Sequence, residues 1–164
     1  MKRVIKVIGK ILSDILIVVL VLFLFLAIYN YINIKVLKKD YTNFIGYTYF
    51  DIVTGSMEDE IQIDDFVFVK ITKDVKVNDI ISFRSDDVIV THRVIEIDEN
   101  KIVTKGDANN TYDNPIRKDD VIGKVVFVGR GFGIFSKVIL SPMVLISLCV
   151  TIILFSTYFS MKNE

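Results

Sequence analysis

Two long apolar runs lie near the ends of this chain of 164 residues and limit what it can fold into. The first run covers residues 11–34 and contains a single charge, Asp14, near its start. The second run covers residues 138–160 and contains no charged residue. A helix crosses a bilayer in about 20 residues, so each run is long enough to span one. We therefore expect two transmembrane helices with one small domain between them.

The first apolar run has the basic start of a secretory signal peptide but lacks its other features. Residues 1–10 carry four basic side chains. The apolar part is too long for a signal peptide, and no small-residue cleavage site follows it, so we expect a retained anchor. Two spans put both termini on one side of the membrane. The positive-inside rule favours the cytoplasm for residues 1–10 and for the tail at residues 161–164, although three lysines also follow the first span.

Between the two runs the pattern changes to short, alternating segments of β-branched and aromatic residues bounded by polar turns. Such segments are typical of β-strands. The pattern predicts strands at residues 65–71, 79–84, 88–97, 101–104 and 121–128. We therefore predict a mainly β fold. A small β domain is expected at residues 51–133, and a membrane-proximal connection at residues 35–50 leads into it.

The composition argues against several classes of function. The chain has 20 basic and 20 acidic residues and a net charge of zero, which gives no basic surface for nucleic acid. It has one histidine, whereas zinc enzymes usually use several, so no metal site is expected. Its one cysteine, Cys149, lies inside the second apolar run, so the chain forms no internal disulfide.

Two polar residues of the central segment have both an ordinary and a catalytic interpretation. Ser56 follows Gly55 at the end of an extended apolar approach, residues 44–53, and a serine after a glycine is usually part of a turn. His92 lies inside an apolar strand, where an imidazole is ordinarily half-buried and bonded to a backbone carbonyl. A hydroxyl and an imidazole are also two of the three groups used in acyl transfer.

A third segment, residues 107–113, is rich in oxygen-bearing side chains. It does not fit a calcium-binding EF-hand loop, because Tyr112 stands where glycine is needed and Lys118 where a bidentate glutamate is needed. The ordinary interpretation is a solvated turn with Asx caps. The functional alternative is a carboxylate that holds an imidazole in the required tautomer.

Taken together, these motifs resemble the endoplasmic-reticulum-type type I signal peptidases, which also occur in archaea and in some bacteria. The resemblance rests on Thr-Gly-Ser-Met-Glu at residues 54–58, His-Arg-Val at 92–94, and Thr-Lys-Gly-Asp at 104–107 with Asp113 a short way on. It covers residues 52–131 and the flanking spans. The plain bacterial type has lysine where this chain has His92, so this residue assigns the subgroup.

The resemblance implies a role for each residue of these motifs. Ser56 would be the nucleophile, His92 the general base and Asp113 the third catalytic member. Asp107 would be a supporting group near the site. Thr54 would join the Ser56 backbone N–H in stabilising the oxyanion, an effect of about 2.7–4 kcal/mol per donor. No metal or organic cofactor is implied.

The resemblance therefore implies a membrane-bound serine endopeptidase that removes N-terminal signal peptides from exported proteins. Its partners would be preproteins and membrane lipid, and its β domain would lie on the extracytoplasmic face of the cytoplasmic membrane. The alternative is a catalytically silent, membrane-tethered β module that assists the assembly or presentation of exported subunits. A self-cleaving repressor with a related fold would need a DNA-binding domain where this chain has a membrane helix.

Two residues near Ser56 depart from the family pattern. Asp59 stands where the family usually has proline, and Asp64 stands where it usually has glycine before the aspartate that begins the next strand. Neither change removes a reacting group. We expect them to alter how a substrate fits around Ser56.

Overall fold

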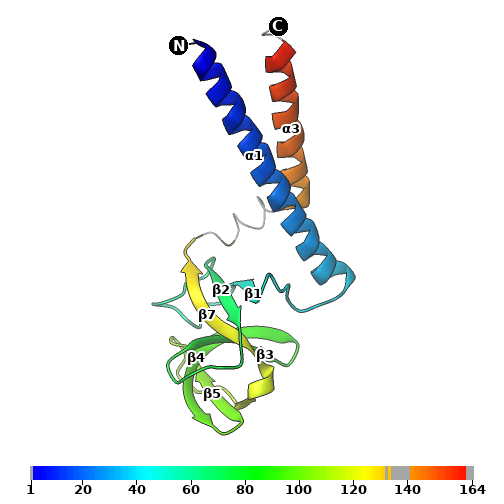
Figure 1. Cartoon of the computed structure of the whole chain (residues 1–164). Helices are drawn as coiled ribbons and strands as arrows, with labels where there is room; N and C mark the ends of the chain where they lie inside the picture. The colour runs from blue at the N-terminus through cyan, green and yellow to red at the C-terminus, as the bar shows by residue number, and fades with distance from the viewer. Residues whose placement is uncertain (1, 132, 134–140, 162–164) are drawn as a thin grey trace. The chain divides into compact units, whose positions relative to one another are not determined.

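A computed structural model describes residues 2–131, 133 and 141–161. The chain divides into two compact units. The first unit combines Met1–Asp40 with Ser136–Glu164, and the second unit is Tyr41–Phe135. Figure 1 shows helices in the first unit and a β-sheet in the second. Each unit is described by itself below.

The first unit contains two helices that pack against each other, α1 (Lys2–Tyr31) and α3 (Pro142–Met161). A short π-helix, η1 (Ile32–Val36), extends α1. The fixed backbone of Pro142 suits the first turn of α3. Leu145 and Cys149, one helical turn apart on α3, are buried.

One membrane-spanning helix is supported by length and composition. The helical segment Val7–Val36 is long and apolar enough to cross a bilayer, with a mean hydropathy of 3.1. In α3 the apolar stretch available for the same test is shorter, Pro142–Leu154. The predicted second span at residues 138–160 begins with residues 138–140, which lie outside the described residues. The second span and the orientation of the chain therefore stay predictions.

The second unit is a sheet of seven antiparallel strands in the order β1-β2-β7-β3-β4-β5-β6, which confirms the predicted mainly β fold. The strands are β1 (Tyr47–Asp51), β2 (Phe66–Ile71), β3 (Ile80–Ser85), β4 (Val88–Asp98), β5 (Lys101–Lys105), β6 (Ile116–Arg117) and β7 (Val121–Gly129), with a 3₁₀ turn, η2 (Lys118–Asp120), between the last two. Five of these strands match the five predicted ones to within one residue at either end. β1 lies inside the segment predicted only as extended, and β6 is too short to show an alternating pattern.

Strand β7 joins two parts of the sheet, because it pairs with β2 through one edge and with β3 through the other. A buried apolar cluster accompanies each part. The cluster beside β2 contains Ile52, Met57, Ile61, Val67, Val69 and Ile80. The cluster beside β3, β4 and β5 contains Ile81, Phe83, Val94, Ile102 and Val121. Burying such side chains contributes about 1.5–3 kcal/mol each, which gives the sheet a stable base for the segments that carry polar groups.

Candidate active site

Three predicted residues meet in the second unit. The Ser56 hydroxyl oxygen lies 3.0 Å from His92 Nε2. The other ring nitrogen, His92 Nδ1, lies 2.6 Å from Asp113 Oδ2. Hydroxyl, imidazole and carboxylate therefore form one continuous hydrogen-bonded row.

The contacts of the ring determine what this row can do. An ionised carboxylate only accepts hydrogen bonds, so Asp113 accepts one from the N–H of His92 Nδ1. In the neutral imidazole Nε2 then carries the free lone pair and faces Ser56. This arrangement equips His92 to accept the proton of the serine hydroxyl.

The sheet fixes the imidazole. His92 lies on β4, paired with Ile81 of β3, and only 6% of the residue is exposed. The edge of the ring faces Phe83, with 6.3 Å between the ring centres. A ring packed in this way keeps one orientation, which is what a base between two partners requires.

The turn that carries Ser56 is held tightly by its neighbours. The Ser56 carbonyl accepts a hydrogen bond from the Ala108 N–H at 3.0 Å. A Cβ on Gly106 would lie 2.5 Å from that same carbonyl oxygen. The glycine of the Lys-Gly-Asp motif thus lets two backbone segments approach, and this main-chain contact holds the turn of Ser56 in place.

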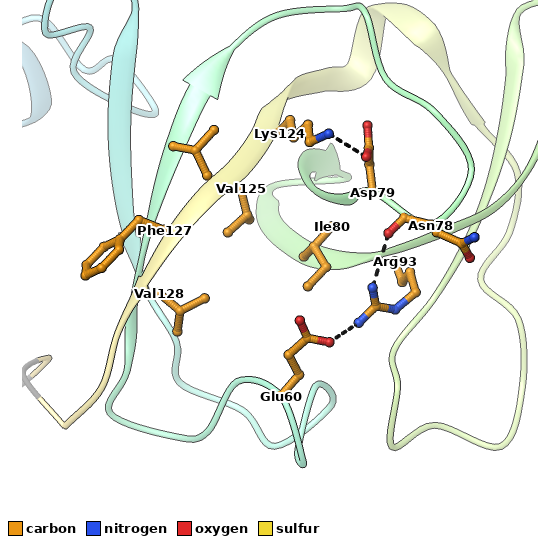
Figure 2. Close-up of a pocket in the computed structure, with 10 residues that line it drawn as sticks. Glu60, Asn78, Asp79, Ile80, Arg93, Lys124, Val125, Phe127 and Val128 are labelled. Atoms are coloured by element: carbon orange, nitrogen blue, oxygen red, sulfur yellow. Dashed lines mark hydrogen bonds and ion pairs between the residues drawn. The ribbon is translucent and has the colours of Figure 1, made fainter.

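A salt-bridge cluster surrounds the predicted supporting residue, Asp107. Arg93 donates two hydrogen bonds to its carboxylate, from Nε at 2.9 Å and from NH2 at 2.7 Å. Arg93 also pairs with Glu60 and donates to the Asn78 carbonyl, as Figure 2 shows. The hydrogen bond to Asp107 raises the pKa of Arg93, burial opposes this effect, and Glu60 adds to the rise. Asp107 therefore acts on Arg93, and the imidazole contact belongs to Asp113.

Arg93 connects the three segments that carry the predicted site residues. It follows His92 on β4, Asp107 precedes the segment of Asp113, and Glu60 follows the turn of Ser56. In the sequence Arg93 is visible only as part of the His-Arg-Val motif. Alternation along a strand would have placed its side chain on the face opposite His92. The pocket of about 340 Å³ in Figure 2 lies on this Arg93 side, and none of the three triad residues lines it.

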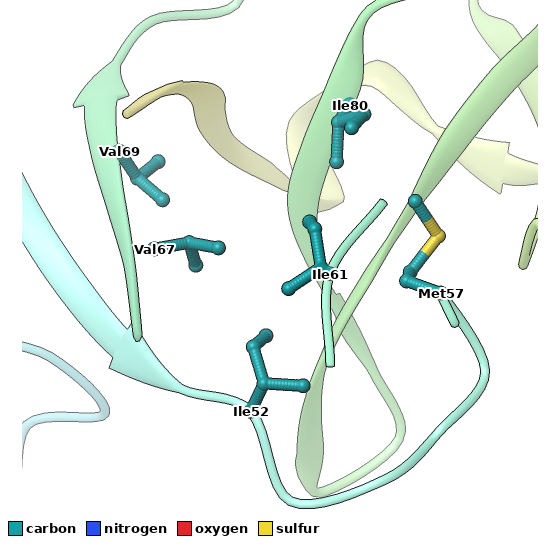
Figure 3. Packing of buried hydrophobic residues seen from close by; sticks show 6 residues of the cluster. All are labelled: Ile52, Met57, Ile61, Val67, Val69 and Ile80. Atoms are coloured by element: carbon teal, nitrogen blue, oxygen red, sulfur yellow. The ribbon is translucent and has the colours of Figure 1, made fainter. Parts of the chain in front are cut away.

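The residue after Ser56 anchors the turn to the core. Met57 is 1% exposed and packs with Ile61 and Ile80, as Figure 3 shows. The Ile61 N–H donates to the Met57 carbonyl at 2.8 Å. The core therefore fixes the chain on one side of Ser56 while the serine hydroxyl reaches His92.

The side chain of Thr54 lies next to that of Ser56. Its hydroxyl oxygen is 3.4 Å from that of Ser56. Among the described residues, the backbone N–H of Ser56 makes no hydrogen bond. The turn thus presents a free N–H donor and a second hydroxyl close to the serine, the kinds of group that stabilise an oxyanion.

The two departures from the family pattern both have a left-handed backbone. Asp64 has φ of 70°, a conformation that glycine adopts without steric cost. Asp59 has φ of 86°, whereas the proline ring fixes φ near −65°. The backbone conformation of this turn therefore excludes proline at position 59. This conformation occurs in the segment that follows Ser56.

No cluster of three or more histidine, cysteine, aspartate or glutamate side chains suited to a metal ion occurs within the described part of the chain.

A family model described as Peptidase S24-like matches residues 32–126, more than half of the chain, and the matched region includes Ser56, His92 and Asp113. A search of curated proteins finds no match.

Proposed function

Since this chain belongs to the Peptidase S24-like family of serine peptidases, we propose that it removes N-terminal signal peptides from exported proteins as a membrane-bound endopeptidase. The observation that carries the proposal is the row of Ser56, His92 and Asp113, with contacts of 3.0 Å and 2.6 Å. A catalytically silent module would have no need for this alignment.

The geometry supports a two-step acyl transfer. His92 Nε2 takes the proton of Ser56 as its hydroxyl oxygen attacks the scissile carbonyl carbon, and the Ser56 N–H and the Thr54 hydroxyl face the developing oxyanion. Asp113 stabilises the imidazolium. The imidazolium then protonates the leaving amine, which breaks the peptide bond and leaves an acyl ester on Ser56. His92 next removes a proton from water as the water oxygen attacks the ester carbon. The bond between that carbon and the Ser56 oxygen then breaks, the acid is released, and the imidazolium returns its proton to the Ser56 oxygen.

Two observations support signal peptides as the substrate class. The order of the motifs around Ser56, His92 and Asp107 resembles signal peptidases of the endoplasmic-reticulum type. The segment Val7–Val36 is apolar enough to anchor the chain in the membrane where signal peptides reside. In the proposed topology residues 138–160 form a second span, both termini are cytoplasmic, and the turn at Asp86 is outside.

Cleavage of a designed preprotein series tests the substrate class. The purified chain in detergent is mixed with preproteins that carry alanine or phenylalanine at the residue before the scissile bond and at the residue two positions earlier. We expect cleavage with alanine at both positions and near loss with phenylalanine at either, because small pockets reject large side chains by steric clash. Equal cleavage of all members would contradict signal-peptide specificity, and no cleavage of any member would favour the silent module.

A further inference from the structure

The hydroxyl of Thr104 meets the carboxylate oxygen that faces the imidazole. Thr104 Oγ1 lies 2.7 Å from Asp113 Oδ2, the same oxygen that lies 2.6 Å from His92 Nδ1. Because an ionised carboxylate only accepts, the threonine hydroxyl donates this hydrogen bond. We propose that Thr104 is a positioning residue that holds the Asp113 carboxylate against His92. The inference rests on the proposed serine-peptidase function.

Thr104 holds both the main chain and the side chain of Asp113. Its backbone carbonyl accepts the Asp113 N–H at 2.9 Å. This bond fixes where the Asp113 backbone lies but leaves the carboxylate rotation open, since the last torsion of an aspartate is broad and two-fold. The hydroxyl bond removes that freedom. Asp113 lies outside the strands, so these two bonds supply the order that a strand would otherwise give.

The sheet sets the position of Thr104 relative to the base. Thr104 lies on β5 opposite Val94 of β4, and Val94 follows His92 by two residues. Thr104 is fully buried, with 0% exposure. Two neighbouring strands in fixed register therefore carry the base and the group that orients its carboxylate.

A second buried hydroxyl separates this role from a purely structural one. Thr91, next to His92 on β4, shares a 2.8 Å hydrogen bond with the buried Ser82 of β3. Both threonines are buried, and the hydroxyl of each has a hydrogen-bond partner, as buried polar groups require. Of these two hydroxyls, the one of Thr104 contacts Asp113 and the one of Thr91 contacts Ser82. Thr91→Val is therefore a matched control for the loss of a buried threonine hydroxyl.

Kinetics of the full-length chain in detergent provide the first test. Thr104→Val keeps the side-chain shape and removes the hydroxyl. We expect kcat for preprotein cleavage to fall about 10- to 100-fold, as for loss of a hydrogen bond to a charged group, with KM unchanged. Thr104→Ser should keep kcat within a few fold of wild type, and Thr91→Val should change kcat by less than about twofold. Wild-type kcat in Thr104→Val, or an equal loss in Thr91→Val, would overturn the inference.

The single histidine of the chain permits a second test that needs no activity. With ¹⁵N-labelled histidine, the proton on Nδ1 gives one NMR signal, shifted far downfield by its short bond to Asp113. We expect Thr104→Val to move this signal upfield, with Thr104→Ser restoring it and Thr91→Val leaving it in place. If Thr104→Val does not fold, Thr104→Ala takes its place. An unmoved signal in a folded variant without the hydroxyl would refute the positioning role, whereas full activity of Ser56→Ala would refute the proposed function instead.

Discussion

His92 Nε2 lies 3.0 Å from the hydroxyl oxygen of Ser56, although 36 positions separate the two residues in the chain. The contact joins a buried strand residue to a turn that is itself held by the Ala108 N–H. The strand that carries His92 and the turn that carries Ser56 are therefore each held by their own backbone hydrogen bonds. This has direct consequences for substitutions at either residue.

Ser56→Ala and His92→Ala should each abolish preprotein cleavage, and the double variant should be little worse than either single variant. The two side chains act in one proton transfer, so their contributions are not additive. Rates measured for the three variants in detergent check this. Independent, multiplicative losses would show that the two residues do not act as a unit.

Asp113→Asn should cost far more activity than Asp107→Asn. Only Asp113 contacts the imidazole, whereas Asp107 binds Arg93. In other serine proteases the corresponding change lowers kcat about 10⁴-fold because the wrong tautomer is favoured, and we expect a loss of roughly that order. The measurement is kcat for both folded variants. A larger loss in Asp107→Asn would exchange the two roles.

Gly106→Ala should lower kcat at least about tenfold. The new Cβ would lie 2.5 Å from the Ser56 carbonyl oxygen, so the nucleophile turn must move, and small displacements of reacting groups are costly. Gly9→Ala is the control, because nothing lies within 4 Å of a Cβ at that position. Full activity of Gly106→Ala would show that the close approach does not position Ser56.

Asp79→Asn should remove a pH-dependent part of the stability. Burial acts to raise the pKa of Asp79, but hydrogen bonds from Lys124 Nζ at 2.6 Å and the Lys76 N–H at 2.9 Å lower it overall. The ionised form is therefore favoured in the folded state. Its contribution is present above the unfolded-state pKa of about 3.9 and is lost as pH falls through the lower folded-state value.

Urea unfolding of the full chain, followed by circular dichroism, measures this effect. At pH 7 we expect Asp79→Asn to lower the free energy of unfolding by about 1 kcal/mol, because Lys124 is partly exposed and screened. The difference from wild type should shrink below about pH 4. The exposed Asp74 gives the control, Asp74→Asn. A difference that stays constant down to pH 2 would contradict this account.

Most of the sheet was predictable because alternation is a local property. β4 is rich in β-branched residues and alternates apolar with polar residues towards its end, and the observed Val88–Asp98 extends the predicted strand by one residue. Ile116–Arg117, in contrast, is a strand only because it pairs with Lys101 and Ile102 of β5. A two-residue strand of this kind is defined by its partner and leaves no pattern in its own sequence.

The site was predictable as a set of residues and not as a geometry. The motif order selected Ser56, His92 and Asp113, but their convergence depends on the whole sheet. The roles of Arg93 and Thr104 arise from contacts between distant segments, such as Arg93 with Glu60. The positive φ of Asp59 was also hidden, since only a few per cent of residues other than glycine have a positive φ.

Cleavage of one preprotein by wild-type chain and by Ser56→Ala, purified in the same detergent and compared by mass spectrometry, tests the central claim most directly. The account predicts that the wild-type chain releases a single mature product cut after the signal peptide. It also predicts that Ser56→Ala, although folded, releases none. Cleavage at the same bond by Ser56→Ala at a rate near that of wild type would contradict the assignment of Ser56 as the nucleophile.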